Sequence, residues 1–215
     1  MSISNLMSQN MTQPSPSHQA LIDQGIINAP SSAKGRLLQA AANLFKEKGY
    51  ERTTVRDLGK AVGIQSGSLF HHYPNKESIL RAVMEETILL NTELMKEALS
   101  QSKKPEDKVL ALIQCELESV LGETGAAMTV LVYEWRSLNE ESQQHILTLR
   151  GIYEDLWISA LSEAKEAGSV VIDPFVLRRL LTGALSWTVN WYRQEGDMTV
   201  DQLAQMTLSL AIKPA

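Results

Sequence analysis

The chain has 215 residues, 44% of them hydrophobic, and a formal net charge of −5 at pH 7. This length allows one large domain, or a small domain followed by a larger one. No apolar run approaches the roughly 20 residues that span a bilayer, and residues 1–10 lack the basic start and apolar core of a secretory signal. The single cysteine, Cys115, excludes an intramolecular disulfide and fits a reducing compartment, so we expect a cytoplasmic protein without a membrane partner.

The charges are unevenly distributed along the chain. Residues 31–80 carry eight Lys and Arg against four Asp and Glu, which is a net charge of +4. Residues 1–30 carry only Asp23, so residues 81–215 must hold a net charge of −8. A short basic segment on an otherwise acidic chain is the pattern expected of a module that binds a polyanion.

The first 30 residues are rich in Ser, Gln, Asn, Met and Pro. This composition predicts a flexible tail, in which a short helix near residues 19–27 would be marginal. The next segment predicts a helix, because Ser31 or Ser32 can cap it and apolar residues then recur at three- and four-residue spacing. Gly49 lies where this helix should end.

Two short helices are predicted next. Thr54 can cap the first, with Asp57 completing a variant of the capping box, and this helix should end near Gly63. The second should cover about residues 66–72 and stop before Pro74. Two short helices joined by a turn that contains glycine are typical of a helix-turn-helix, whose second helix enters the major groove of DNA.

The remainder of the chain also predicts helices. A long helix should begin near Lys76 after a cap at Asn75. Five more are predicted from apolar periodicity and from glycines at the joints, at about residues 106–121, 125–138, 141–167, 173–195 and 199–212. The sequence therefore predicts an all-α protein of about nine helices. The predicted domains are a flexible tail (1–30), a three-helix helix-turn-helix domain (31–78) and a C-terminal helical bundle (79–215).

The second short helix would present small and polar side chains outward. Small residues allow a close approach to the groove, and Ser, Gln and His side chains can contact bases or phosphates. We therefore predict a double-stranded DNA operator as the partner. The candidate contacts that this helix offers are Gln65, Ser66, Gly67, Ser68, His71 and His72.

This segment resembles the N-terminal domain of the tetracycline-repressor (TetR) family. The family pattern is a helix, then Gly-Tyr-x-x-Thr-Thr-Val, then Ala-x-Gly-Val-Ser-x-Gly-x-Leu-Tyr-x-His/Tyr-Phe-x-x-Lys-Glu. The matching positions are Gly49-Tyr50, Thr53-Thr54-Val55, Ala61-Val62-Gly63-Ile64, Gly67-Ser68-Leu69-Phe70, His72-Tyr73 and Lys76-Glu77. The resemblance implies a homodimeric repressor whose C-terminal body binds a small effector.

The resemblance also implies roles for single residues. The phosphate contacts of the family fall on Thr54, Tyr73 and Lys76, and Thr53 and Val55 beside Thr54 are also candidate DNA contacts. Its base-reading positions fall on Gln65, Ser66, Ser68, His71 and His72. Gln65 replaces the Ser that usually caps the second helix, and Phe70 replaces a Tyr whose hydroxyl often contacts phosphate. Both departures make the operator sequence harder to predict, and neither removes the fold.

The C-terminal part resembles a branch of the same family that includes regulators of lipid, sterol and aromatic-acid breakdown, which respond to acyl-CoA thioesters. The resemblance rests on residues 134–138, 150–153 and 183–196. Aromatic, Met and Leu side chains on several helices could line an apolar pocket inside a bundle, and guanidinium groups would suit the phosphates of CoA. The candidate effector contacts are Cys115, Met128, Trp135, Tyr153, Trp157, Arg178, Arg179 and Trp187.

The last two predicted helices are apolar on more than one face, so they should be buried on two sides. Packing against the same helices of a second chain would achieve this, and Gly183 and Ala184 would allow a close approach. The candidate dimer contacts are Leu181, Ala184, Leu185, Leu203 and Met206.

Other functions fit the sequence less well. It contains no phosphate-binding glycine loop, His-Glu-x-x-His or Gly-x-Ser-x-Gly, so we expect neither an enzyme nor a bound cofactor. The adjacent His71 and His72 would point about 100° apart on a helix, which disfavours a shared metal ion. Two alternatives remain open. One is a helical protein–protein adaptor without DNA binding, and the other is a regulator of a neutral lipophile or efflux response.

Overall fold

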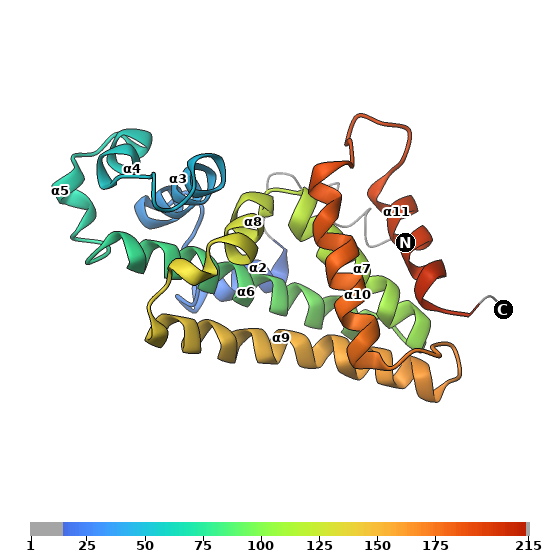
Figure 1. Ribbon diagram of the computed structural model, residues 1–215. Coiled ribbons are helices and arrows are strands. Elements are labelled where there is room, and N and C mark those ends of the chain that lie inside the picture. The colour runs from blue at the N-terminus through green and yellow to red at the C-terminus, as the bar shows by residue number, and fades with distance from the viewer. Residues whose placement is uncertain (1–14, 214–215) are drawn as a thin grey trace. The chain divides into compact units, whose positions relative to one another are not determined.

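The computed structural model describes residues 15–213, which form ten α-helices, two 3-10 helices and no β-strand (Figure 1). The α-helices are α2 (Pro16–Asp23), α3 (Ala33–Lys48), α4 (Val55–Val62), α5 (Ser66–Leu69), α6 (Lys76–Gln101), α7 (Pro105–Leu121), α8 (Gly125–Tyr133), α9 (Glu140–Glu166), α10 (Pro174–Trp187) and α11 (Val200–Ala211). The 3-10 helices are η1 (Trp135–Ser137) and η2 (Thr188–Asn190). The predicted all-α class is confirmed. Within the described range no helix is long and apolar enough to cross a membrane.

The chain forms two compact units. The N-terminal unit contains residues 20–90 and 123–150, and the described part of the C-terminal unit contains residues 15–19, 91–122 and 151–213. Helices α6 and α9 contribute residues to both units. This division differs from the boundary at residue 78 that the sequence suggested, because α8 packs against α3 and therefore belongs to the N-terminal unit.

The ends and the apolar face of α3 are those that its sequence predicts. The hydroxyl of Ser32 accepts a hydrogen bond from the Gly35 amide at 2.9 Å, as an N-cap does. At the other end Gly49 has a φ of 83°, a conformation that glycine adopts without steric cost. The buried residues of the helix are Leu37, Leu38, Ala41, Ala42 and Phe45. The predicted first helix is therefore confirmed.

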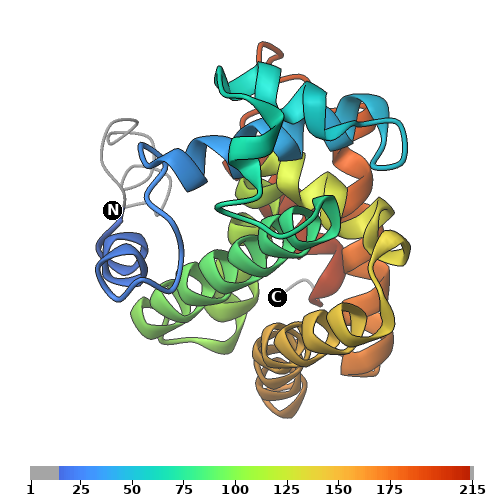
Figure 2. The same cartoon turned by 90° about the vertical axis from the view of Figure 1, so that its left-hand side faces the viewer.

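The residues before α3 are partly folded. Residues 16–23 form α2, and the side chains of Leu21 and Ile27 are buried. The backbone and side-chain amides of Asn28 both donate to the carboxylate of Glu86, and Figure 2 shows this blue segment beside the green α6. The prediction of a flexible tail is therefore wrong for residues 16–30, because apolar burial and charged hydrogen bonds hold the segment. The same prediction for residues 1–14 lies outside the described residues.

The core of the C-terminal unit is built around α7. Helices α10 and α11 both pack against it. Ten of the 17 residues of α7 are buried, so the helix is enclosed over most of its circumference. Pro105 at the first turn and the two acidic residues that follow it favour the start of the helix.

Helix α10 ends earlier than the periodicity predicted. The sequence indicated a helix over residues 173–195, whereas α10 ends at Trp187 and η2 follows. The hydroxyl of Thr188 donates to the carbonyl of Leu185 at 2.6 Å, and the amide of Trp191 donates to the carbonyl of Thr188 at 3.1 Å. Such local hydrogen bonds compete with those of a continuing helix, and periodicity does not reveal them.

Candidate functional site

Helix α4 begins at a complete capping box. The hydroxyl of Thr54 accepts a hydrogen bond from the Asp57 amide at 3.1 Å, and the Asp57 carboxylate accepts one from the Thr54 amide at 2.9 Å. The hydrogen bonds from Thr54, with a smaller contribution from Lys48 at 3.5 Å, hold the pKa of the Asp57 carboxyl below its ordinary value. The predicted capping box is confirmed, and it sets where the first helix of the motif starts.

A tight turn connects α4 to α5. Gly63 ends α4 in the left-handed conformation with a φ of 73°, and the Ile64 amide donates to the Gly59 carbonyl at 2.9 Å. Gln65 makes no side-chain cap bond at the start of α5, as the poor capping ability of Gln predicts. Leu69 is buried and anchors α5. Since α4 packs against both α3 and α5, the three helices form a helix-turn-helix.

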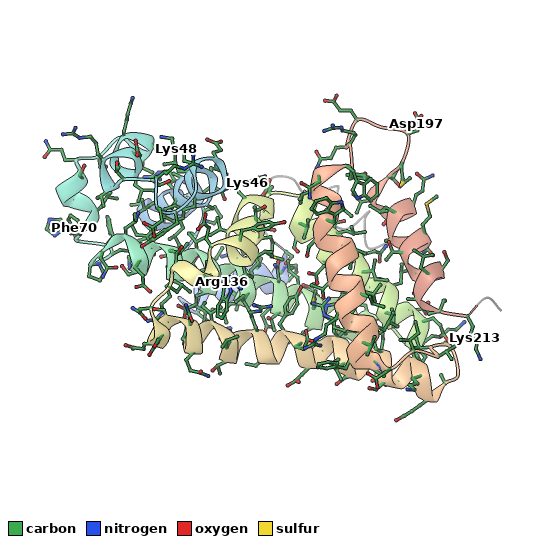
Figure 3. All side chains as sticks on the ribbon, viewed as in Figure 1. Lys46, Lys48, Phe70, Arg136, Asp197 and Lys213 are labelled. Carbon is green, nitrogen blue, oxygen red and sulfur yellow. The ribbon has the colours of Figure 1, made fainter. Side chains whose placement is uncertain are left out.

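The predicted base-reading residues lie in α5 and directly before and after it. Gln65, Ser68 and His71 are exposed, as is Gly67 between them, and Ser66 and His72 are half-buried. Phe70 is 52% exposed and projects from the end of α5 (Figure 3). In the comparison with the family pattern, Phe70 was noted only because it lacks the hydroxyl group of the usual Tyr. An exposed aromatic ring at this position can contact a thymine methyl group, so we add Phe70 to the candidate contacts.

Thr53 is not on the accessible surface of the motif. Its side chain is fully buried, and its hydroxyl donates to the carbonyl of Gly49 at 2.9 Å. This residue therefore ties the start of α4 to the end of α3, which corrects its assignment as a DNA contact. Thr54 beside it is exposed, and Val55 is half-buried in the first turn of α4.

Lys76 stabilises the loop between α3 and α4. Its ammonium group donates to the backbone carbonyls of Tyr50 at 2.9 Å and of Thr53 at 3.0 Å, and lies 4.0 Å from the centre of the Tyr50 ring. These contacts combine charged hydrogen bonds with a cation–π interaction. An ammonium group has three donors, so Lys76 keeps one for a phosphate and stays a candidate DNA contact.

We expect Lys76→Met to weaken both the fold and DNA binding. Losing the hydrogen bonds should lower the free energy of unfolding by about 1–3 kcal/mol. All DNA sequences should lose affinity to a similar degree, because a phosphate contact carries no base information. Urea unfolding and DNA binding should be measured beside Lys46→Met, which changes an exposed lysine of α3 (Figure 3). Equal stability of the two variants would mean that the Lys76 hydrogen bonds do not support the fold.

Tyr73 packs against the segment that precedes α3. Burial, and secondarily the carboxylate of Glu86, raise the pKa of its hydroxyl to about 12, so the group is protonated at neutral pH. Its side chain is hydrogen-bonded to Asn28, and the ammonium group of Lys34 lies 5.8 Å from the centre of its ring. Tyr73 is therefore half-buried, and its predicted phosphate contact stays a prediction.

Positive charge is exposed on the unit that carries α5. Of the eight basic residues between residues 31 and 80, all except the half-buried Lys76 are exposed, namely Lys34, Arg36, Lys46, Lys48, Arg52, Arg56 and Lys60. Exposed positive charge attracts a phosphate backbone and makes the resulting affinity strongly dependent on salt. The N-terminal unit therefore combines an exposed polar helix with the electrostatics that DNA binding requires.

A buried polar cluster in the C-terminal unit contains three of the predicted effector residues. Arg178 is 3% exposed, and its guanidinium carbon lies 4.4 Å from the centre of the Trp157 ring and 5.6 Å from that of Tyr153. Cys115 lies in the same core as Trp157. Burial raises the pKa of the Cys115 thiol to about 12, so this residue is a small, protonated core group.

Two carboxylates that the sequence pattern did not reveal neutralise Arg178. Glu116 on α7 is also 3% exposed, lies 3.6 Å from the guanidinium and accepts a hydrogen bond from the Tyr153 hydroxyl. Glu154 on α9 lies 3.3 Å from Arg178 and 3.1 Å from Arg179. The sequence could have revealed Glu116, because it lies among the apolar residues of α7. A charged side chain in such a helix is buried only with a partner, so a buried cation nearby could have been expected. We call Glu116, Tyr153, Glu154, Trp157 and Arg178 the Arg178 cluster.

The other predicted effector residues lie elsewhere. Met128 on α8 is buried and Trp135 in η1 is half-buried, and both belong to the N-terminal unit. Arg179 is exposed on α10. Trp187 is 61% exposed, which corrects its assignment to a pocket lining. Helical periodicity shows which residues share a face, but it does not show whether that face is covered.

Helix α10 presents an exposed apolar stripe. It consists of Val176, Leu180, Gly183, Ala184 and Trp187, which recur at three- and four-residue spacing and therefore share one face. On α11, Met206 and Leu210 are also exposed. We call the first set the α10 stripe.

Three of the five predicted dimer contacts are buried inside their own chain. Leu181, Leu185 and Leu203 belong to the core around α7, with 7% or less of their surface exposed. They lie on the inner faces of their helices, which corrects their assignment to a surface that a second chain could meet. Ala184 and Met206 are exposed and stay candidates.

A chain that is all-α over its described residues, and that carries an exposed helix-turn-helix in the basic segment 31–80, is a DNA-binding regulator by class. The chain belongs to the tetR family of bacterial regulatory proteins. Residues 37–83 match that family, and residues 102–214 match the tetracyclin repressor-like C-terminal domain. Members of the family are transcriptional regulators, not enzymes, and bind operator DNA as homodimers.

Individual relatives match over most of the chain. The HTH-type transcriptional repressor KstR2 of Rhodococcus jostii (strain RHA1) is 32% identical over 189 residues, which cover 85% of this chain and 90% of that protein. A solved structure described as the superantigen pfit is 52% identical, covers 92% of this chain and 98% of its own, and has a TM-score of 0.81. AibR, solved with isovaleryl coenzyme A and operator DNA, is 24% identical, covers 86% of this chain and 100% of its own, and has a TM-score of 0.78. The likeness to AibR shows a common fold.

Proposed function

We propose that the protein is a repressor that binds a palindromic operator as a homodimer and is released by a small hydrophobic effector, an acyl-CoA thioester. The exposed polar face of α5, together with the seven exposed basic residues between residues 31 and 80, is the observation that carries the DNA-binding part. We expect a regulator that binds operator DNA to act in the bacterial cytoplasm, where the DNA is.

Release would follow from a shift between two conformations. The two α5 helices of a dimer must lie roughly 34–36 Å apart to enter successive major grooves. An effector that prefers a conformation with another spacing weakens DNA binding by its difference in affinity for the two conformations.

In this proposal α5 reads the bases, whereas the exposed lysines and arginines between residues 31 and 80 bind the phosphates. Ser68→Ala and His71→Ala should change the preferred operator sequence, at a cost of about 1–3 kcal/mol at particular base pairs. Arg56→Ala removes an exposed charge and should weaken binding to all sequences alike, with a shallower dependence on salt. Binding to a library of single-base operator variants measures both effects. A uniform loss for all three proteins would contradict this division of roles.

The effector part rests on the C-terminal unit. Its core is rich in Leu and Ala side chains and includes Met95 and Trp157, and such apolar side chains would hold an acyl chain through apolar burial. AibR, which has this fold, was solved with isovaleryl coenzyme A. That complex is the support for choosing a thioester.

The phosphates of CoA would need cations other than Arg178. Glu116 and Glu154 already neutralise Arg178, and Glu154 also pairs with Arg179. Arg193, in the same unit, is exposed and could serve. We therefore propose that the acyl group is buried and that the nucleotide stays near the surface.

A DNA-release assay tests the effector. Octanoyl-CoA and isovaleryl-CoA, the matching free acids and CoA alone should be added to the protein bound to its operator. Release by a thioester at micromolar concentration, without release by the acid or by CoA, is the expected result. Release by neutral lipophiles alone would contradict the thioester and support the neutral-effector alternative.

A protein-binding role is the alternative from a different class. The relative with 52% identity is described as a superantigen and not as a transcriptional regulator. The exposed basic residues around α5 favour DNA instead. If this chain bound no duplex from its genomic neighbourhood more tightly than random DNA, the adaptor reading would replace the repressor.

A further inference from the structure

Two buried N–H groups of the Arg178 cluster have no hydrogen-bond partner among residues 15–213. They are Nη1 of Arg178 and Nε1 of Trp157. Trp157 is fully buried and Arg178 nearly so, and the two side chains are stacked, with 4.4 Å from the guanidinium carbon to the ring centre. Buried donors in proteins are almost always paired, so two unpaired donors on two stacked side chains need an explanation.

The charges around these donors decide which acceptor they can take. Arg178 faces Glu116 on α7 and Glu154 on α9, and Glu154 also pairs with Arg179. Two arginines against two carboxylates leave the cluster with no formal net charge. A carboxylate or phosphate placed here would gain no net attraction and would lie close to buried Glu116, where low polarity strengthens repulsion. A neutral oxygen can accept both hydrogen bonds without adding a charge.

We propose that Arg178 Nη1 and Trp157 Nε1 form a subsite for a neutral carbonyl oxygen of the effector, such as that of a ketone or thioester, and that this subsite rejects carboxylates. The proposal rests on the proposed function, because it takes the C-terminal unit as the effector site. Glu116 is a positioning residue: together with Tyr153 it holds the guanidinium while leaving Nη1 unpaired.

The subsite is tested on the full-length protein with matched probes of eight carbons. These are 2-octanone, which offers only a neutral carbonyl, octanoate, which adds a charge, and octanoyl-CoA. Calorimetry should show 2-octanone binding at least about tenfold more tightly than octanoate. Trp157→Phe keeps an aromatic ring but removes the donor, so it should weaken 2-octanone about tenfold. Trp191→Phe removes an exposed indole of the same unit and should leave binding unchanged.

The indole N–H of Trp157 provides a direct readout. The chain has four tryptophans, so a sample labelled with ¹⁵N on the indole nitrogen gives four side-chain signals, and Trp157→Phe identifies one of them by its loss. The proton of that signal should move downfield when 2-octanone binds, because the N–H gains an acceptor, and should not move with octanoate. No movement, no binding of 2-octanone, or tighter binding of octanoate would each overturn the proposal.

The role of Arg178 is tested by substituting it together with Glu116. Arg178→Gln alone leaves Glu116 buried without its cation and risks unfolding. The double variant Arg178→Gln with Glu116→Gln removes both charges and should bind 2-octanone at least about tenfold more weakly. Binding as tight as in the wild type would exclude Arg178 from the subsite.

DNA release separates this proposal from the proposed function. If octanoyl-CoA releases DNA equally from the wild type and from Trp157→Phe, the carbonyl subsite is wrong and the repressor mechanism stands. If 2-octanone binds at Trp157 as described but no thioester releases DNA, the subsite stands and the thioester part of the proposed function fails.

Discussion

Gly67→Glu should lower the affinity for operator DNA by at least about 100-fold, roughly 3 kcal/mol, without unfolding the protein. Gly67 is exposed at the centre of α5, and a Cβ atom added there would meet no atom within 4 Å. The new carboxylate therefore fits the fold but points to where the phosphates and base edges of DNA would lie. Like charges brought together in an interface cost several kcal/mol.

Gly151→Glu is the control for Gly67→Glu, because it makes the same substitution at another glycine in open space. Gly151 on α9 is also exposed, and an added Cβ would likewise meet nothing within 4 Å. Gly151→Glu introduces the same charge away from the helix-turn-helix and should bind DNA almost as the wild type does. Fluorescence anisotropy at several salt concentrations measures both variants. Similar affinities for the two would show that α5 does not face DNA.

Leu180→Glu and Ala184→Arg should convert the dimer into monomers. Both residues are exposed in the α10 stripe, which is apolar and contains the small residues Gly183 and Ala184 for close approach. In a two-fold interface each substitution buries two unpaired charges, one from each chain. The dissociation constant of the dimer should therefore rise at least about 100-fold. DNA affinity should fall with it, because a monomer reaches only one half-site.

The controls separate the interface from the core. Leu147→Glu changes an exposed leucine of the N-terminal unit and should leave the dimer intact. Leu185→Glu places a charge in the core around α7 and should unfold the protein rather than yield folded monomers. Analytical ultracentrifugation and circular dichroism distinguish the cases. A wild-type protein that is monomeric at micromolar concentration, or a Leu180→Glu variant that stays dimeric, would contradict the proposed interface.

Local chemistry explains which elements could be predicted from the sequence. The Ser32 and Thr54 caps and the glycines at positions 49 and 63 each act within one turn of chain, so their geometry follows from neighbouring residues. The exposed face of α5 could be predicted for the same reason, because it depends on residues close together in the sequence. Even the poor cap at Gln65 was predictable, since its side chain is longer than those of Ser and Asn and does not hold its oxygen in the capping position.

The features that were missed depend on which helix surfaces pack against each other, and the spacing of residues in the sequence does not encode this packing. Thr53 and Lys76 look like DNA contacts by position, but their polar groups bond to backbone carbonyls in the adjacent loop. Leu185 and Trp187 lie two residues apart on an apolar helix, yet one is in the core and the other on the surface. Arg178 could be recognised as neutralised only after α7 and α9 had brought Glu116 and Glu154 to it.

Direct competition between duplexes tests the central claim, that this chain is a sequence-specific DNA-binding regulator. The protein should be titrated into labelled duplexes that tile the DNA upstream of its own gene, at physiological salt and with excess random duplex. We predict that one near-palindromic duplex binds at least about 10³-fold more tightly than random DNA, with an affinity that falls steeply as salt rises. Equal affinity for every duplex would contradict the account.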